Sequence, residues 1–280
     1  MNHKDIYVAI LGLKANFRGE ELVQKVEALG ITPEVIWGIP VEEIGIERLL
    51  NYANQEQARY ITGRNLTVQE ISCALGHLEM YESFLNSGKK IALFLEEDAD
   101  FDHTLESILD IEYPENELAI LQIGGYLDSH LLPKPFPATF PKAGEPFRTI
   151  QGILRCLQYP VYAHGYLMNR AAALEAVHLM RSRKINTPAD FPFAWRSSIP
   201  FYITVRQFVW QREGSSSIEG NRSVLEKNRR VSSNFERRIK RIASISPLHL
   251  YRGRKLGLSG RSVLREKLFY YLLSRYYSDS

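Results

Sequence analysis

An apolar run that ends abruptly in acidic residues is the sequence feature that limits the fold of this chain most. Residues 91–101 read IALFLEEDADF, in which five mostly large apolar residues precede four carboxylates within five positions. A continuous apolar run of this length is typical of a strand that is buried on both faces in an α/β sheet. Four neighbouring carboxylates raise the free energy of the folded chain unless a cation, a cationic partner or solvent compensates them. In open α/β sheets, ligands bind beyond the carboxyl ends of the strands, which is where these acids would lie.

The rest of the chain predicts a fold in which strands and helices alternate. Thr67 and Glu70 have capping-box spacing, so we expect a helix from there to about residue 85. The β-α-β opening favours a mostly parallel, Rossmann-type sheet flanked by helices. Residues 128–151 are rich in Pro and are expected to be irregular. The hydrophobic pattern further predicts strands over 5–11, 33–37, 117–125 and 161–169, one or two strands over 201–211, and helices over 19–29, 41–54 and 170–180.

The composition is that of a globular protein whose cysteines form no cluster in the sequence. Hydrophobic residues make up 45% of the 280 residues and charged ones 24%, so neither disorder nor a fibrous repeat is indicated. The two cysteines, Cys73 and Cys156, lie far apart. This spacing predicts neither a disulfide framework nor a structural zinc site, and it favours a reducing cytoplasm. We expect no signal peptide, and no apolar segment has the roughly 20 residues that a membrane-spanning helix needs.

A basic C-terminal extension follows an acidic body. Residues 222–280 contain 15 Lys and Arg against four acidic residues, whereas residues 1–221 contain 20 basic and 28 acidic residues. We therefore divide the chain into a domain over 1–221 and a basic, aromatic-rich helical extension over 222–280. Interleaved basic and aromatic residues favour an anionic membrane surface as a partner. RNA binding and a solvated helix pair are the alternatives; no RNA-binding motif is present, and the acidic body would repel a polyanion.

Three short motifs lie close together in residues 66–101: Ser72-Cys73, Gly76-His77 and Glu96-Glu97-Asp98. With these motifs, the segment resembles the central signature of glycosyltransferase family 25, the lipopolysaccharide and lipooligosaccharide glycosyltransferases. That signature has a Gly or Ser and Cys, then Ser-His, in a helix, followed by an apolar strand that ends in Glu-Asp-Asp. Two departures occur: Gly76 replaces the serine and Glu97 replaces the middle aspartate, and neither removes a carboxylate.

Further segments resemble the family in the same order. The stretch INTPADFPF is similar to the family's Pro-x-Asp motif and has Asp190 at the acidic position. The stretch QREGSSSI, residues 211–218, is similar to the family's closing segment. The opening agrees more loosely with the family's first strand and basic turn, with Lys14 and Arg18 as candidates for binding the nucleotide phosphates. The resemblance covers residues 6–218 and leaves out the basic extension.

The resemblance implies a GT-A-like fold over residues 1–221 and a transferase that inverts the anomeric carbon of its sugar. The implied donor is a UDP-hexose, with galactose favoured over glucose. The implied acceptor is a lipid-linked oligosaccharide at the inner face of a bacterial cytoplasmic membrane. Nucleic acid is not among the expected partners.

Such a reaction needs two kinds of chemical group. The departing nucleoside diphosphate develops negative charge, which Mn²⁺ or Mg²⁺ can neutralise, and these hard cations prefer oxygen ligands. We expect Asp98 to hold the metal together with Glu96 or Asp100. The acceptor hydroxyl loses a proton during attack. Asp190, a lone acid in an apolar, Pro-rich stretch, is our leading candidate for the base, and His77 is the second candidate catalytic residue. The expected donor-binding residues are Lys14, Arg18, Glu96, Glu97, Asp98, Gln211 and Ser216.

Plainer interpretations stay open at this point. The acids could form a solvated turn, His77 could be a core residue with satisfied hydrogen bonds, and Asp190 could cap a turn. A catalytically inactive sugar-binding or scaffold protein with the same fold is the alternative function. A metal-dependent phosphate hydrolase is a second alternative, against which the lack of a His-rich metal motif argues.

Overall fold

The computed structural model describes residues 5–62, 64–111, 113, 117–124, 153–156, 163–189, 195, 198–204 and 207–212. All of these residues belong to one compact unit, residues 1–214. Asp190, Ser216, the Pro-rich stretch 128–151 and the extension 222–280 lie outside the described residues. What the sequence predicts for them, and for the domain boundary at residue 221, stays a prediction.

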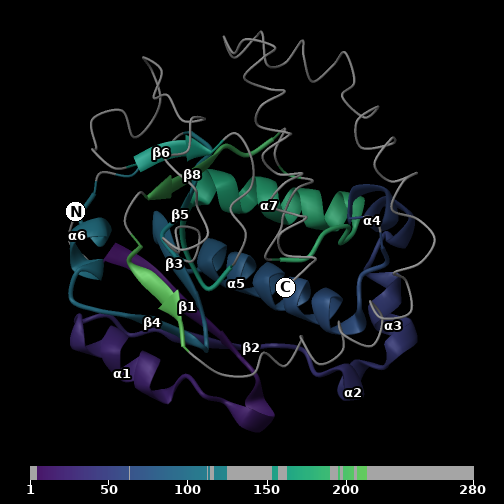
Figure 1. Cartoon of the computed structure of the whole chain (residues 1–280), viewed down its shortest axis with the longest axis horizontal. Coiled ribbons are helices and arrows are strands. Elements are labelled where there is room, and N and C mark those ends of the chain that lie inside the picture. The colour runs from purple at the N-terminus through teal and green to yellow at the C-terminus, as the bar shows by residue number, and fades with distance from the viewer. Residues whose placement is uncertain are drawn as a thin grey trace, which may run out of the picture. The chain divides into compact units, whose positions relative to one another are not determined.

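A seven-stranded mixed sheet forms the centre of this unit (Figure 1). β1 pairs in parallel with β2 and β3, and β5 pairs in parallel with β8. β7 lies antiparallel between β3 and β5, and β6 lies antiparallel to β8. All strands except β7 and β6 therefore run in one direction, which confirms the predicted α/β fold with a mostly parallel sheet. The spatial order is β2 (Glu34–Trp37), β1 (Ile6–Gly12), β3 (Ile91–Glu96), β7 (Gly165–Asn169), β5 (Ile120–Gln122), β8 (Phe201–Thr204) and β6 (Ile153–Cys156).

Helices pack on both faces of the sheet, as the complete burial of β1 requires. Because side chains alternate along a strand, the odd-numbered residues of β1 face one core and the even-numbered ones face another. Tyr7, Ala9 and Leu11 share the first core with α5 and α7, whereas residues 6, 8 and 10 share the second with α1 and α6. The helices are α1 (Glu20–Ala28), α2 (Val41–Ile44), α3 (Ile46–Asn51), α4 (Gln55–Thr62), α5 (Val68–Asn86), α6 (Leu105–Leu109) and α7 (Arg170–Arg183), with a short 3₁₀ turn, η2 (Lys14–Asn16). None of the helices that the structure describes has the length and apolarity to cross a membrane.

The long helix α5 begins and packs as its sequence predicts. The Thr67 side chain accepts a hydrogen bond from the Glu70 amide at 3.2 Å, and the Glu70 carboxylate accepts one from the Thr67 amide at 2.9 Å. These two bonds confirm the predicted capping box. Further along the helix, a Cβ atom on Gly76 would lie 2.6 Å from a methyl group of Leu11 on β1. Close packing of α5 on the sheet therefore accounts for glycine, where the resembled family has serine.

The structure differs from the sequence prediction in several places, and neither α6 nor β6 was predicted. The single helix expected over 41–54 is wrong: Gly45, with a φ of 83°, separates α2 from α3. α4 follows them and was not predicted. The acidic segment continues into a short strand, β4 (Ala99–Phe101), which pairs antiparallel with β9 (Val209–Gln211) in a separate two-stranded sheet. Residues 201–211 therefore hold two strands that belong to different sheets.

Candidate active site

The four acids of residues 96–100 lie at the carboxyl edge of the central sheet. β3 ends at Glu96, between the end of β1 and the start of β7. The Glu96 amide donates to the His164 carbonyl at 3.3 Å, and the Glu97 amide donates to the Leu11 carbonyl at 2.9 Å. The turn after β3 is therefore tied to both neighbouring strands. This is the edge at which open α/β sheets bind ligands.

Glu96 points towards α5 and pairs with a buried histidine. His77 Nε2 lies 3.4 Å from a Glu96 carboxylate oxygen, with the His77 side chain 2% exposed and that of Glu96 27% exposed. Burial acts to raise the pKa of Glu96, but the hydrogen bond and charge of His77, together with the charge of His164, outweigh it, so the pKa lies below its ordinary value. Glu96 is therefore held as a carboxylate.

Glu97 points to the opposite side and holds the loop that follows β1. Its carboxylate accepts hydrogen bonds from the amides of Leu13 at 3.1 Å and Arg18 at 3.4 Å. The Arg18 guanidinium lies 3.7 Å from the same carboxylate. A Cβ atom on Gly12 would lie 2.5 Å from the Phe17 ring and 3.1 Å from Glu97 Oε2, so a glycine there leaves room for both side chains. Glu97 thus positions the loop that carries Lys14 and Arg18, both of which are exposed.

Asp98 and Asp100 have different surroundings. One oxygen of Asp98 accepts a hydrogen bond from Gln211 at 2.7 Å, whereas Oδ1 is buried and has no hydrogen-bond partner among the residues that the structure describes. Asp100 accepts a hydrogen bond from Lys25 at 2.6 Å and lies 4.0 Å from the Arg212 guanidinium. Asp100 is therefore compensated by cations of the chain itself, and Asp98 keeps an oxygen available for a further cation.

The predicted metal ligands do not converge as one set. Among the residues that the structure describes, the group of three possible ligand atoms within 4.8 Å of one another consists of Cys73, His77 and Glu96. Glu96, Asp98 and Asp100 are not such a group. A magnesium or manganese ion nevertheless fits at Asp98, because such ions are commonly held by one or two carboxylates and the phosphates of a substrate. The buried, unpartnered oxygen of Asp98 is the feature that favours a cation there.

His77 and His164 are both buried, and both act electrostatically on Glu96. His77 Nδ1 shares a hydrogen bond of 2.8 Å with the Tyr166 hydroxyl, which shares another of 2.8 Å with Tyr81. Burial lowers the pKa of His164, against the opposing charges of Glu96 and Asp98. Both ring nitrogens of His77 thus face protein groups, which fits a residue that positions Glu96. The closeness of His164 to the acids was not predicted, because it depends on β7 lying beside β3.

An exposed tryptophan lies at the same edge of the sheet. Trp37 ends β2, is 40% exposed and makes an edge-to-face contact with Phe17, their ring centroids being 5.2 Å apart. The Gly38 amide donates to the Gly12 carbonyl at 2.8 Å, which joins the ends of β2 and β1. A flat aromatic face beside the Lys14–Arg18 loop suits a nucleotide base. The sequence pattern gave no sign of this, since PEVIW reads only as a strand.

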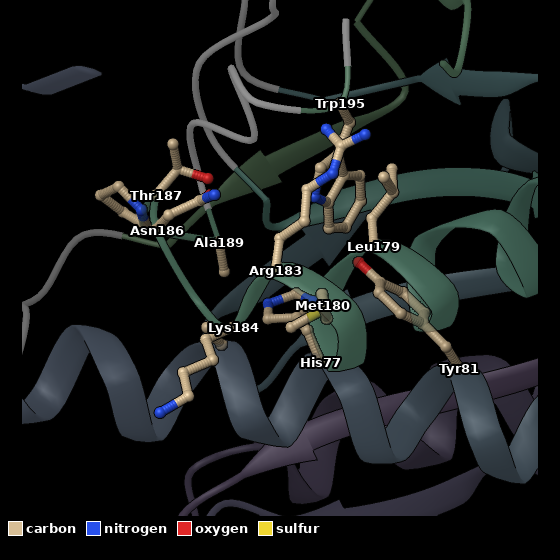
Figure 2. A pocket seen from close by; sticks show the side chains of 12 residues that line it. His77, Tyr81, Leu179, Met180, Arg183, Lys184, Asn186, Thr187, Ala189 and Trp195 are labelled. Atoms are coloured by element: carbon tan, nitrogen blue, oxygen red, sulfur yellow. The ribbon is translucent and has the colours of Figure 1, made fainter. Parts of the chain in front are cut away.

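A small pocket lies between α5 and α7, and His77 forms part of its lining. Figure 2 shows His77 and Tyr81 facing Leu179 and Met180, with Trp195 close by. The segment after α7 lines the rest of the pocket and is anchored: the Asn54 amide donates to the Ile185 carbonyl at 2.8 Å, and the Asn186 side chain donates to Gln57 at 2.9 Å. The described part of this segment ends at Ala189, directly before Asp190 in the sequence.

Removal of the Glu97 carboxylate will destabilise the protein. Glu97→Ala removes the carboxylate that accepts from two loop amides, and a hydrogen bond to a charged group contributes about 1.5–3 kcal/mol of unfolding free energy. Urea unfolding measures this loss. Glu106→Ala is the matched control, because Glu106 is exposed on α6 and should change the unfolding free energy by no more than about 0.5 kcal/mol. Equal stability of the two variants would contradict the role given to Glu97.

Comparisons with known proteins identify the family of this chain. Residues 4–192 match the family model described as glycosyltransferase family 25 (LPS biosynthesis protein). No curated protein matches the chain. Among solved structures, it is similar to a glycosyltransferase involved in the glycosylation of the major capsid of PBCV-1, with 12% identity, a TM-score of 0.38 and coverage of 79% of this chain and 99% of that one. It is also similar to A197 from STIV, with 10% identity, a TM-score of 0.35 and coverage of 76% and 96%. The family match includes α5 and the acidic end of β3, and the chain therefore belongs to glycosyltransferase family 25.

Proposed function

We propose that this protein transfers a hexose from a UDP-sugar to a saccharide acceptor of lipopolysaccharide or lipooligosaccharide, with inversion and with the help of a divalent metal. Galactose is the first sugar to test and glucose the second. The observation that carries the proposal is the buried oxygen of Asp98 that none of the described residues hydrogen-bonds. Asp98 directly follows Glu97, the residue that holds the loop carrying Lys14 and Arg18. Membership of glycosyltransferase family 25 supports transferase activity. A GT-A-like arrangement of the domain is part of the proposal.

The metal would be Mn²⁺ or Mg²⁺, held by Asp98 together with Glu96. Two observations favour Glu96 over Asp100 as the second ligand. Asp100 is already paired with Lys25, and the low pKa of Glu96 keeps it ionised. When bound, the ion neutralises the negative charge that develops on the departing diphosphate.

The residues of the chain would bind the donor along the same edge. Lys14 and Arg18 attract the two phosphates, and Trp37 offers a surface on which the uracil ring stacks. Gln211 holds Asp98 in place and, with Ser216, would donate hydrogen bonds to the sugar or the diphosphate. Glu97 acts indirectly, by fixing the loop that carries the two cations.

The acceptor hydroxyl would attack the anomeric carbon from the side opposite the diphosphate. A bond forms between the acceptor oxygen and this carbon while the bond from the carbon to the diphosphate oxygen breaks, so the configuration inverts. Asp190 takes the proton of the acceptor hydroxyl. We assign His77 a positioning role, because Tyr166 fixes its ring and Glu96 lies at its other nitrogen.

The basic extension would bring the enzyme to its acceptor. Residues 222–280 carry the excess of Lys and Arg that an anionic lipid surface attracts, worth about 1 kcal/mol per residue near the membrane. The proposal therefore includes a peripheral position at the inner face of the cytoplasmic membrane and a lipid-linked acceptor. Binding to nucleic acid is not part of it.

Calorimetric titration with UDP tests the donor site. We expect UDP to bind more tightly with Mn²⁺ present than without it, because the metal offsets the repulsion between Asp98 and the diphosphate. Absence of binding in both conditions would contradict the proposal. An inactive sugar-binding protein, the alternative function, would bind a UDP-hexose but release no UDP from it over time.

A further inference from the structure

A second cluster of ligand groups lies behind the acidic edge, on the α5 side of the sheet. Cys73 and His77 are four residues apart on α5, so their side chains share one face of the helix. Glu96 ends β3 opposite this face. One ligand atom from each residue lies within 4.8 Å of the others. His77 is buried, while Cys73 and Glu96 are partly exposed, so the group is reachable from solvent.

We infer that Cys73, His77 and Glu96 form a binding site for Zn²⁺, in which Glu96 uses the oxygen that faces His77; its other oxygen is the one that would face the hard metal proposed at Asp98. A thiolate, an imidazole and a carboxylate are the three protein ligands from which zinc sites are built, with a water or other ligand in the fourth position. Soft thiolate and imidazole ligands disfavour Mg²⁺ and Mn²⁺, which prefer oxygen. The mixed ligand set therefore selects for a different ion from the one that a diphosphate requires.

The distances between the ligands already suit a tetrahedral ion. Nitrogen and oxygen ligands about 2.1 Å from one zinc ion, at the tetrahedral angle, lie about 3.4 Å apart. His77 Nε2 and Glu96 Oε1 are 3.4 Å apart, which is long for a hydrogen bond and equal to this edge of the tetrahedron. The Cys73 sulfur lies within 4.8 Å of the other two ligand atoms, and a tetrahedral ion requires about 3.6 Å, so its distances to them must shorten by up to about 1.2 Å, within the range of a side-chain rotation.

The surroundings of His77 hold its ring in the orientation that a zinc ligand needs. Zinc-bound histidines donate a hydrogen bond from their second ring nitrogen to a protein acceptor, which fixes the ring and its tautomer. His77 Nδ1 lies 2.8 Å from the Tyr166 hydroxyl, and this leaves Nε2 for the metal. Tyr166 is fixed in turn by Tyr81. On binding, the Cys73 thiol loses its proton to solvent and its sulfur forms the bond to zinc.

Zinc binding to the full chain, freed of metal with a chelator and kept reduced, tests the inference. Zn²⁺ alone is titrated, so the result is independent of the proposed UDP-sugar activity. We expect one site that Cys73→Ser removes and that Glu96→Gln weakens by about tenfold or more. Cys156→Ser is the matched control, since it removes the other cysteine of the chain and should leave zinc binding unchanged. Unchanged zinc binding in Cys73→Ser would overturn the inference.

Two readouts remain decisive if a variant does not fold. Cobalt in place of zinc should give the visible bands of a tetrahedral ion and a thiolate charge-transfer band in the unsubstituted chain and in Cys156→Ser. In the unsubstituted chain, Zn²⁺ should slow alkylation of Cys73, as measured by mass spectrometry, because the thiolate is bound to the ion. A cobalt spectrum without the thiolate band, or alkylation of Cys73 at the same rate with and without zinc, would overturn the inference.

Discussion

Asp98→Asn will lower kcat for hexose transfer by about a thousandfold or more and will leave the fold intact. A metal that neutralises the leaving diphosphate contributes several kcal/mol, and each 1.4 kcal/mol or so is a factor of ten in rate. The amide keeps the shape of the side chain and can still accept the hydrogen bond from Gln211, but it removes the charge that would hold the ion. Steady-state kinetics with saturating Mn²⁺ measure the loss, and circular dichroism checks the fold.

Asp102→Asn is the matched control for this substitution. Asp102 is exposed, comes four residues after Asp98 and accepts hydrogen bonds from Thr104, which an asparagine oxygen can also accept. We expect this variant to keep the kcat of the unsubstituted enzyme. Full activity in Asp98→Asn would reject the assignment of the metal to Asp98.

Asp190→Asn will lower kcat by about 10²–10⁴-fold, the contribution that a positioned general base makes. The asparagine cannot take the proton of the acceptor hydroxyl. The KM for the donor and the affinity for UDP with Mn²⁺ should stay unchanged, because the donor would lie with Asp98 and the Lys14–Arg18 loop. This separation of kcat from donor binding distinguishes Asp190 from Asp98.

Asp190→Glu provides the comparison for the base. It restores a carboxylate at a slightly different distance, so it should recover part of the activity that asparagine loses. Parent-like kcat in Asp190→Asn would mean that another group takes the proton. The effect of Asp190→Asn on kcat is independent of the proposed zinc site, because the substitution leaves Cys73, His77 and Glu96 in place.

Local patterns predicted the elements that depend on neighbours in the sequence. The β-α-β opening, the capping box at Thr67 and the strand that ends at Glu96 follow from periodicity and turn chemistry, and the structure confirms them. The break at Gly45 was missed because a helical pattern runs through it, while its positive φ ends one helix and starts the next. β4 was missed because it exists only through pairing with β9, about 110 residues further along the chain.

The site was predicted in its residue types more than in its geometry. The acids of residues 96–100 do lie at the carboxyl edge of the sheet, as a strand end in an α/β fold requires. The alternative that these acids form a simple solvated turn does not hold. Glu97 accepts hydrogen bonds from backbone amides, and Asp100 is paired with Lys25. Successive residues of a turn point in different directions, so four neighbouring carboxylates reach different partners. This compensation, which the sequence could not show, lowers the cost of placing so many like charges together.

Sequence distance also concealed contacts between segments. Cys73 and His77 were separated from Glu96 by a helix end and a loop, so no metal motif was visible in the sequence. His164 approaches the acids only because β7 is inserted beside β3. The exposure of Trp37 depends on which face of the sheet edge stays uncovered.

Transfer of a hexose in the presence of Mn²⁺ is the decisive test of the proposed activity. The full chain is incubated with UDP-galactose or UDP-glucose and a lipooligosaccharide acceptor, UDP release is followed over time, and the linkage of the product is assigned by NMR. We expect metal-dependent UDP release from one of the two donors and a β-linked product from the α-linked donor. A folded protein that releases no UDP from either donor, with or without Mn²⁺, or a product that retains the α configuration, would contradict it.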